Sequence, residues 1–184
     1  PVVAAIGGRD VMTPIASIGG GKLQVLPFAF DCLKGEWFNY LDAPMGEDSL
    51  LVPGAGLDWR TPLMTWNRIC VSCHSTAAEP GYDVASDTYR TTVAHPSIDC
   101  ENCHGPARRH DRLMGRVKAG EAALPPRGAQ EIASTKGLTD AQGNEMCAPC
   151  HVRRRPLARG FLAGRQFFDY FDLPLLEDDE AFWP

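Results

Sequence analysis

Residues 70–74 read Cys-Val-Ser-Cys-His, and the pattern returns as Cys-Glu-Asn-Cys-His at 100–104 and as Cys-Ala-Pro-Cys-His at 147–151. In this motif two thiols form thioethers with the edge of a porphyrin, and the adjacent imidazole binds the iron. The pattern uses all but one of the seven cysteines. It predicts three c-type haems (haem C), held by Cys70, Cys73, His74, Cys100, Cys103, His104, Cys147, Cys150 and His151.

Zinc is the first alternative, because Cys-x-x-Cys pairs also form zinc knuckles. A knuckle needs two paired half-sites that together give four ligands. Here three half-sites each carry a His directly beside the second Cys, a position that is useful for haem and redundant for zinc. The spacing therefore favours haem over zinc or a redox dithiol.

The composition predicts a fold that is mainly irregular and α-helical. The 184 residues fit one domain, but 18 Gly and 15 Pro interrupt the chain too often for long regular elements. Three porphyrins would also supply apolar surface in place of a continuous aliphatic interior. We expect a few short helices, a small N-terminal β element and long ordered loops wrapped around three haems.

Three segments are expected to form one cooperative domain. Residues 1–60 contain no haem motif and form a support segment, 61–160 form the triheme core, and 161–184 form an extended arm that ends in an acidic run. In the support segment the apolar run 23–28 predicts one arm of a hairpin, which Pro27 limits to an edge or a bulge.

Helices are predicted around the motifs. The first covers 61–75, where Thr61 can cap and Pro62 suits the first helical position. A second covers 107–118 and places His110 and Met114 on one face. Residues 119–138 form a connecting loop, and a third helix begins at Thr139.

The five histidines leave a deficit of iron ligands. His74, His104 and His151 serve as proximal ligands, so His95 and His110 remain for three distal positions. Each lies too close in sequence to the second motif to reach the opposite face of the same porphyrin, and His110 is assigned to a neighbouring haem, with the first favoured. The third distal position falls to another chain, to a missing segment, to nothing, or to one of Met12, Met64 and Met114.

Arginines follow the motifs closely. Arg108 and Arg109 come after the second motif, and Arg153 opens a run of three after the third. A guanidinium in this position can clamp a haem propionate bidentately, with a solvated basic turn as the alternative.

Cys32, the net charge and the hydropathy of the chain give weaker indications of its function and location than the haem motifs do. Cys32 is flanked by four aromatic residues, which predicts a buried thiol, with an intermolecular thiol as the alternative. The formal net charge of −5 argues against a nucleic-acid partner. The chain has no apolar stretch of about 18 residues that could span a bilayer, and its start at Pro1 is expected of a processed or incomplete chain.

With these residues in view, the chain resembles a family of bacterial multihaem c-type cytochromes often fused to tetratricopeptide repeats and related in motif style to the tetrahaem cytochromes of ammonia oxidation. The resemblance covers about residues 18–175. The matching pieces are Gly20–Pro27, Trp37-Phe38, Trp66-Asn67, His74-Ser75-Thr76, Tyr82-Asp83, Ile98–Pro106 with His110, and Cys147–His151 with Arg153-Arg154.

The sequence also departs from that family. A further haem motif upstream and repeat helices downstream are absent, Ala107 replaces a common Gly, and Ala94-His95-Pro96 stands where many relatives lack His. These differences suggest a trimmed or specialised triheme version. Since such motifs receive haem outside the cytoplasmic membrane, the resemblance implies a periplasmic or extracellular location.

The expected function is electron transfer between redox protein partners. The ligand deficit favours a subunit of a larger redox or photosynthetic complex, or identical copies in an extracellular filament, over a soluble carrier. The alternative is a multihaem oxidoreductase that acts on a small nitrogen or sulfur compound at a five-coordinate haem. A structural module with passive haems is the third hypothesis.

Overall fold

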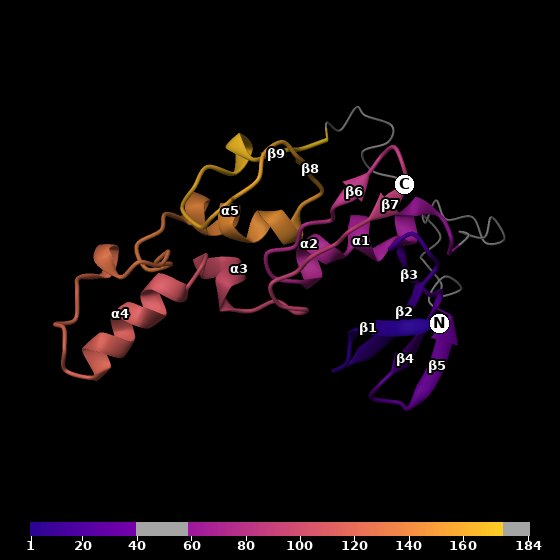
Figure 1. Ribbon diagram of the computed structural model, residues 1–184, viewed down its shortest axis with the longest axis horizontal. Helices are drawn as coiled ribbons and strands as arrows, with labels where there is room; N and C mark the ends of the chain where they lie inside the picture. The colour runs from indigo at the N-terminus through magenta and orange to yellow at the C-terminus, as the bar shows by residue number, and fades with distance from the viewer. Residues whose placement is uncertain (40–58, 175–184) are drawn as a thin grey trace. The chain divides into compact units, whose positions relative to one another are not determined.

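The computed structural model describes residues 1–39 and 59–174, which form two compact units (Figure 1). The first unit lies within Pro1–Ala94 and the second begins at His95. The acidic end of the predicted C-terminal arm and part of the predicted support segment lie outside the described residues.

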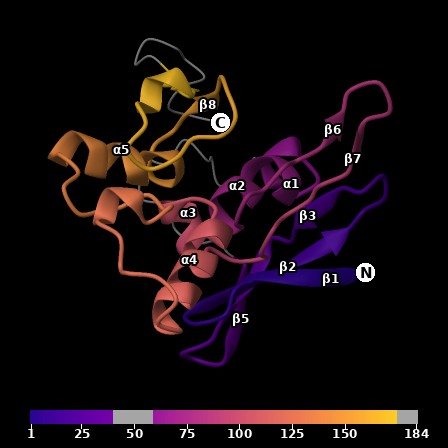
Figure 2. The same ribbon diagram turned by 60° about the vertical axis from the view of Figure 1, so that its left-hand side comes forward.

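An antiparallel sheet of five strands opens the first unit (Figure 2). Its strands are β1 (Val2–Gly7), β2 (Val11–Ser17), β3 (Leu23–Val25), β4 (Phe28–Asp31) and β5 (Glu36–Asn39). They follow the order β1-β2-β4-β5, and β3 pairs with β2 beyond the end of β4. The sheet is larger than the single hairpin predicted, and Pro27 lies in the gap between β3 and β4, where its missing N–H interrupts no ladder.

The core of the first unit lies between this sheet and the segment that carries the first motif. The apolar side chains that are buried there are those of Ile15, Val25, Ala29, Met64 and Val71. Ile15 and Val25 are cross-strand partners, so the sheet contributes one continuous apolar patch to this core.

The segment predicted as one helix at 61–75 is helical but broken. It forms a 3-10 turn η1 (Pro62–Met64), then α1 (Trp66–Ile69) and α2 (Val71–His74). Pro62 takes the first position as predicted, whereas the predicted cap is wrong, since the Thr61 side chain makes no capping hydrogen bond. Thr65 has an extended backbone (ψ 110°), which separates η1 from α1.

A short hairpin completes the first unit and packs on the glycine turn before β3. Its strands are β6 (Tyr82–Asp83) and β7 (Thr88–Tyr89). The Tyr89 N–H donates to the Gly20 carbonyl at 2.9 Å. At Gly21, with φ +71°, a Cβ atom would lie 2.0 Å from the Tyr89 carbonyl oxygen, so the close approach requires glycine.

The second unit contains the longer helices. They are α3 (Cys100–His104), α4 (Arg108–Lys118) and α5 (Asp140–His151), with 3-10 turns η2 (Arg127–Ala129) and η3 (Phe167–Asp169) and the strand pair β8 (Arg155–Pro156) and β9 (Phe171–Asp172). The helix predicted at 107–118 and the helix predicted to begin at Thr139 are confirmed. Thr139 and Gln142 form a capping box at the start of α5.

Aromatic residues gather after the third motif. Phe161 contacts Phe167, Tyr170 and Phe171 with ring centroids 5.5 to 6.3 Å apart. The Phe167 N–H donates to the Glu145 carboxylate of α5 at 3.3 Å. Residues 161–174 are thereby attached to the helix that carries the third motif.

No helix in the described ranges has the length and apolar character needed to cross a membrane.

Candidate haem attachment sites

All three Cys-x-x-Cys-His motifs adopt the same local structure. Each ends in a helix whose last residue is the motif histidine, at His74 in α2, His104 in α3 and His151 in α5, and in the first motif Cys70 is the helical residue that joins α1 to α2. Residues three apart on a helix share a face, so the two thiols of each motif lie one turn apart on one side. This arrangement suits two thioether bonds to one porphyrin edge and presents the imidazole beside them.

The first motif is the most enclosed. Cys70 and Cys73 are half-buried, whereas the other four motif cysteines are exposed, and none of the described cysteines forms a disulfide. Burial raises the pKa of the Cys70 thiol to about 11, and the nearby Cys73 thiol adds to the shift. Val71 between them is fully buried, which fixes α2 on the core of the first unit.

Two buried amides connect the sheet to this motif. The Gln24 amide donates to the Trp59 and Thr61 carbonyls at 2.6 and 2.8 Å. Asn67 accepts from the Leu23 N–H at 2.7 Å and donates to the Thr91 hydroxyl at 2.7 Å. Sequence reasoning missed these roles, because a lone amide side chain gives no sign of burial.

The second motif is held by a capping box. The Asp99 carboxylate accepts from the Glu101 N–H at 2.8 Å, and Asn102 accepts from the Asp99 N–H at 3.3 Å. Asp99 and Asn102 have the three-residue spacing typical of this motif, so the sequence contained a usable signal. Glu101 then accepts from the Ala107 N–H at 2.7 Å, which fixes the turn into α4.

Two histidine rings of the second unit donate to backbone carbonyls. His104 Nδ1 lies 2.9 Å from the Ala133 oxygen, and His110 Nδ1 lies 2.7 Å from the Gln130 oxygen. A carbonyl oxygen can only accept, so Nδ1 carries the proton in both rings. The neutral ring then presents the Nε2 lone pair, which is the form that ligates iron.

His95 has the reverse arrangement. Its Nδ1 faces the Ser97 hydroxyl at 2.9 Å and the Ser97 N–H at 3.4 Å. An N–H can only donate, so this contact favours a lone pair on Nδ1 and the proton on Nε2. His95 and the motif residues His74 and His151 are exposed, whereas His104 and His110 are half-buried.

The other predicted iron ligands are dispersed. Met64 lies in the core at 9% exposure, Met12 is half-buried in β2, and Met114 is half-buried in α4, one turn after His110. Within the described ranges no three His, Cys, Asp or Glu side chains are grouped to bind a metal ion by themselves.

The arginines predicted to bind propionates differ in their contacts. Arg109 Nε lies 3.3 Å from the Glu131 carboxylate, and Arg108, Arg109 and Arg153 are all exposed. Arg154 donates to the Pro149 carbonyl at 2.5 Å and stacks over the Phe171 ring at 4.4 Å. Arg154 therefore links the end of α5 to the aromatic residues that follow it.

The prediction that Cys32 is buried is wrong, because its side chain is only partly shielded from solvent. Cys32 is half-buried, because the aromatic residues around it are themselves exposed, with 40% for Phe28 and 57% for Trp37. These rings contact one another edge to face on the sheet, so they do not enclose the thiol.

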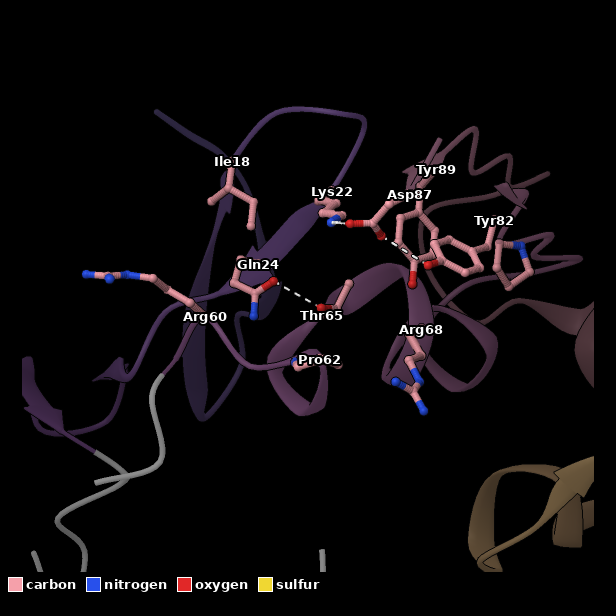
Figure 3. Close-up of a pocket in the computed structure, with 11 residues that line it drawn as sticks. Ile18, Lys22, Gln24, Arg60, Pro62, Thr65, Arg68, Tyr82, Asp87 and Tyr89 are labelled. Carbon is pink, nitrogen blue, oxygen red and sulfur yellow. Dashed lines mark hydrogen bonds and ion pairs between the residues drawn. The ribbon is translucent and has the colours of Figure 1, made fainter. Parts of the chain in front are cut away.

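A cavity of about 550 Å³ lies in the first unit beside the glycine turn (Figure 3). Lys22 pairs with Asp87 at 2.5 Å, and the Tyr82 hydroxyl donates to the same carboxylate at 3.0 Å. The hydrogen bond from Lys22 and then that from Tyr82 lower the pKa of Asp87. None of the predicted haem ligands lines this cavity.

One protein family and two solved structures are similar to this chain. Residues 58–105, which include the first two motifs, match the family described as cytochrome c554 and c-prime. The solved outer cell wall cytochrome OcwA is similar in fold, with a TM-score of 0.54 at 20% identity over 93% of this chain and 32% of that chain. The undecaheme cytochrome from the S-layer of Carboxydothermus ferrireducens gives a TM-score of 0.48 at 22% identity over 82% of this chain and 18% of that chain.

The chain spans about a third of the length of OcwA and less of the S-layer cytochrome. No curated protein matches it.

The motif helices and the family match are those of a class, the multihaem c-type cytochromes, to which this chain is similar and whose cofactor is c-type haem. Within this class, the first two motifs are similar to cytochrome c554 and c-prime, and the fold is similar to that of OcwA. The resemblance to multihaem c-type cytochromes predicted from the sequence is confirmed, as is a fold of few short helices, small sheets and long loops.

Proposed function

We propose that the chain transfers electrons through three covalently attached c-type haems, one at each motif. The observation that supports this most directly is the common geometry of α2, α3 and α5, each of which ends on its motif histidine. When bound, each haem supplies a one-electron iron couple. The chain attaches the porphyrins through thiols, orients the proximal imidazoles and determines how much water reaches each site.

The sparse core of the second unit supports a cofactor-filled interior. Of residues 95–174, those that are buried are Gly105, Phe167 and Phe171. The helices α3, α4 and α5 contain no buried residue. Porphyrins attached to α3 and α5 would supply the apolar surface that these helices need to be held in place.

His110 is the distal ligand that the structure supports best. Its bond to the Gln130 carbonyl leaves Nε2 available, and it lies on a helix outside the motif, so it can ligate an iron other than that of the second haem. His95 remains the second predicted distal ligand. For the third position we keep Met12, Met114 or a residue of another chain, since Met64 belongs to the core.

Arg108 and Arg153 are proposed to pair with haem propionates, since both are exposed and lie shortly after a motif histidine. Arg109 belongs to the same proposal, and its guanidinium also contacts Glu131.

We further propose that the chain works outside the cytoplasmic membrane with redox protein partners, as a subunit of a larger complex or as one of many copies in a filament. The fold similarity to an outer cell wall cytochrome supports this location. The support segment 1–60, the triheme core 61–160 and the arm 161–184 would then act as one cooperative domain once haem is attached.

The second candidate function is an oxidoreductase with a five-coordinate haem that acts on a small nitrogen or sulfur compound. The Ser97 contact of His95 favours it, because the neutral ring has its Nε2 protonated and does not ligate iron in that form. The candidate requires an iron with an open distal position.

The decisive experiment is low-temperature EPR of the oxidised protein, with spins quantified against total haem and the haem number taken from the intact mass. We expect three haems per chain, all low-spin. A high-spin fraction of about one-third would support the oxidoreductase instead. Fewer than three covalent haems would contradict the proposal as stated.

A further inference from the structure

One loop of the second unit accepts hydrogen bonds from the Nδ1 atoms of His104 and His110, which leaves Nε2 of each ring available as an iron ligand. The carbonyls of Gln130 and Ala133 lie three positions apart and accept from His110 and His104. We name residues 125–133 the carbonyl loop; it contains η2. Its carbonyls reach a proximal ligand on α3 and the proposed distal ligand on α4.

The carbonyl loop is attached at several points. The Ala133 N–H donates to the His104 carbonyl at 3.0 Å, while the His104 ring donates to the Ala133 carbonyl, so these two residues bond reciprocally. The Gln130 side chain donates to the Pro125 carbonyl at 3.2 Å. These bonds fix both carbonyls relative to the two rings.

Glu131 shapes the loop between the two carbonyls. Its φ is +59°, in the left-handed region that non-glycine residues rarely adopt. The chain bends at residues 130–132, between the two carbonyls. The Glu131 side chain contacts Arg109, but both groups are largely exposed, with 43% and 80%, so the ion pair alone does not explain the conformation.

We propose that the carbonyl loop sets the orientation and the basicity of two iron ligands, His104 and His110, and that Glu131 is its positioning residue. This rests on the proposed function, since it assumes haem at the second motif and ligation by His110. An imidazole that donates from Nδ1 to a carbonyl is a stronger base at Nε2 and favours ferric over ferrous iron. The loop therefore lowers the potentials of two haems together and fixes the planes of their axial rings.

Backbone carbonyls cannot be mutated directly, so the test changes the conformation that presents them. Glu131→Val places a β-branched residue where φ is positive, which such residues tolerate worst. Glu131→Gly keeps this conformation accessible and removes the same carboxylate. Glu131→Gln removes the charge with little change in shape.

The readouts are a potentiometric titration and the low-spin EPR g-values of the holoprotein. For Glu131→Val we expect the ferric-to-ferrous ratio of two haems, at a fixed potential, to fall about tenfold, the lower end of the effect of outer-shell partners. This equals a rise of about 59 mV for a one-electron couple. The g-values of the same two haems should shift, and the third haem should stay unchanged. Glu131→Gly and Glu131→Gln should resemble the unmodified protein.

Equal haem potentials in Glu131→Val and Glu131→Gly would overturn the inference. An equal shift of the haem potentials in all three variants would also overturn it, because it would indicate an effect of the lost charge. If Glu131→Val does not mature, Glu131→Ala is compared with Glu131→Gly by the same criteria. The haem number and spin state of the unmodified protein distinguish failure of this inference from failure of the proposed function. Three low-spin haems with no response to Glu131→Val refute only the role of the loop, whereas fewer haems refute the proposed function itself.

Discussion

Gln24 of β3 and Thr65, the residue that separates η1 from α1, are joined by a buried hydrogen bond in which the Thr65 hydroxyl donates to the Gln24 amide oxygen at 3.1 Å. Gln24 is fully buried and Thr65 is 6% exposed. The bond connects the haem-free sheet to the helices of the first motif. It also explains why the chain leaves the helical conformation at Thr65, where η1 ends and the hydroxyl meets the sheet.

We expect Gln24→Leu to destabilise the protein by about 3 kcal/mol, because two backbone carbonyls and the Thr65 hydroxyl lose a buried partner. Chemical denaturation of the holoprotein measures the change. Gln166→Leu is the matched control, since Gln166 is exposed and its side chain does not cap η3; its effect should stay within about 0.5 kcal/mol. Equal midpoints for the two variants would show that the buried amide contributes nothing.

The number of haems is tested at the third motif, which lies outside the matched residues 58–105. The double change Cys147→Ser with Cys150→Ser should lower the denatured mass by one haem and leave the other two attached, because both thioethers of that site are lost. Cys32→Ser should leave the haem number unchanged. An unaltered mass increment in the double variant would remove the third motif from the haem sites.

The two candidate distal ligands, His110 and His95, differ in which ring nitrogen carries the proton. His110→Ala should convert about one-third of the haem signal from low-spin to high-spin, since an iron loses an imidazole. EPR of the oxidised variant measures this fraction. His95→Ala is the parallel variant. Since His95 is the second predicted distal ligand, we expect the same conversion, which requires its Ser97 contact to break on haem binding.

If His110→Ala leaves every iron low-spin, then His110 is no ligand, and its bond to Gln130 serves packing alone.

The Lys22–Asp87–Tyr82 cluster makes part of the stability depend on pH. The hydrogen bond from Lys22 lowers the pKa of Asp87 below its ordinary value of 3.8. A lowered carboxyl pKa stabilises the fold above the unfolded pKa and loses that contribution as the pH falls through the folded value. Asp87→Asn should therefore lower the denaturation midpoint at pH 7, and the difference from the unmodified protein should vanish in acid once the pH has fallen below the folded pKa of Asp87.

Salt provides the control for this pair. Because the cluster is exposed, about 1 M salt should narrow the difference at pH 7 by screening the charges. A difference that persists unchanged in acid would mean that Asp87 acts through its shape and not through its charge.

Local patterns were predictable from the sequence and long-range pairings were not. The three motifs, the helix around His110 and the cap at Thr139 depend on residues a few positions apart, and the structure has these helices where they were expected. The five-stranded sheet depends on pairings such as that of Met12 with Phe30, for which a single sequence gives no direct signal.

The roles of Gln24 and of the carbonyl loop were missed for a further reason. Every residue carries a backbone carbonyl, so nothing in the identities of Gln130 or Ala133 indicates that their oxygens face histidine rings. The positive φ of Glu131 was equally hidden, since glutamate is not a residue that predicts a left-handed turn.

The reciprocal pairing of His104 with Ala133 has a consequence for the order in which the protein is assembled. The two thiols of the second motif are presented by a helix that is complete at His104 itself, whereas its imidazole is held by a residue 29 positions later. When the chain is synthesised from its N-terminus, both thiols and the imidazole of this motif are therefore present before Ala133, which orients the imidazole. Presentation of the two thiols thus depends on local structure alone, whereas orientation of the imidazole depends on a contact across 29 positions.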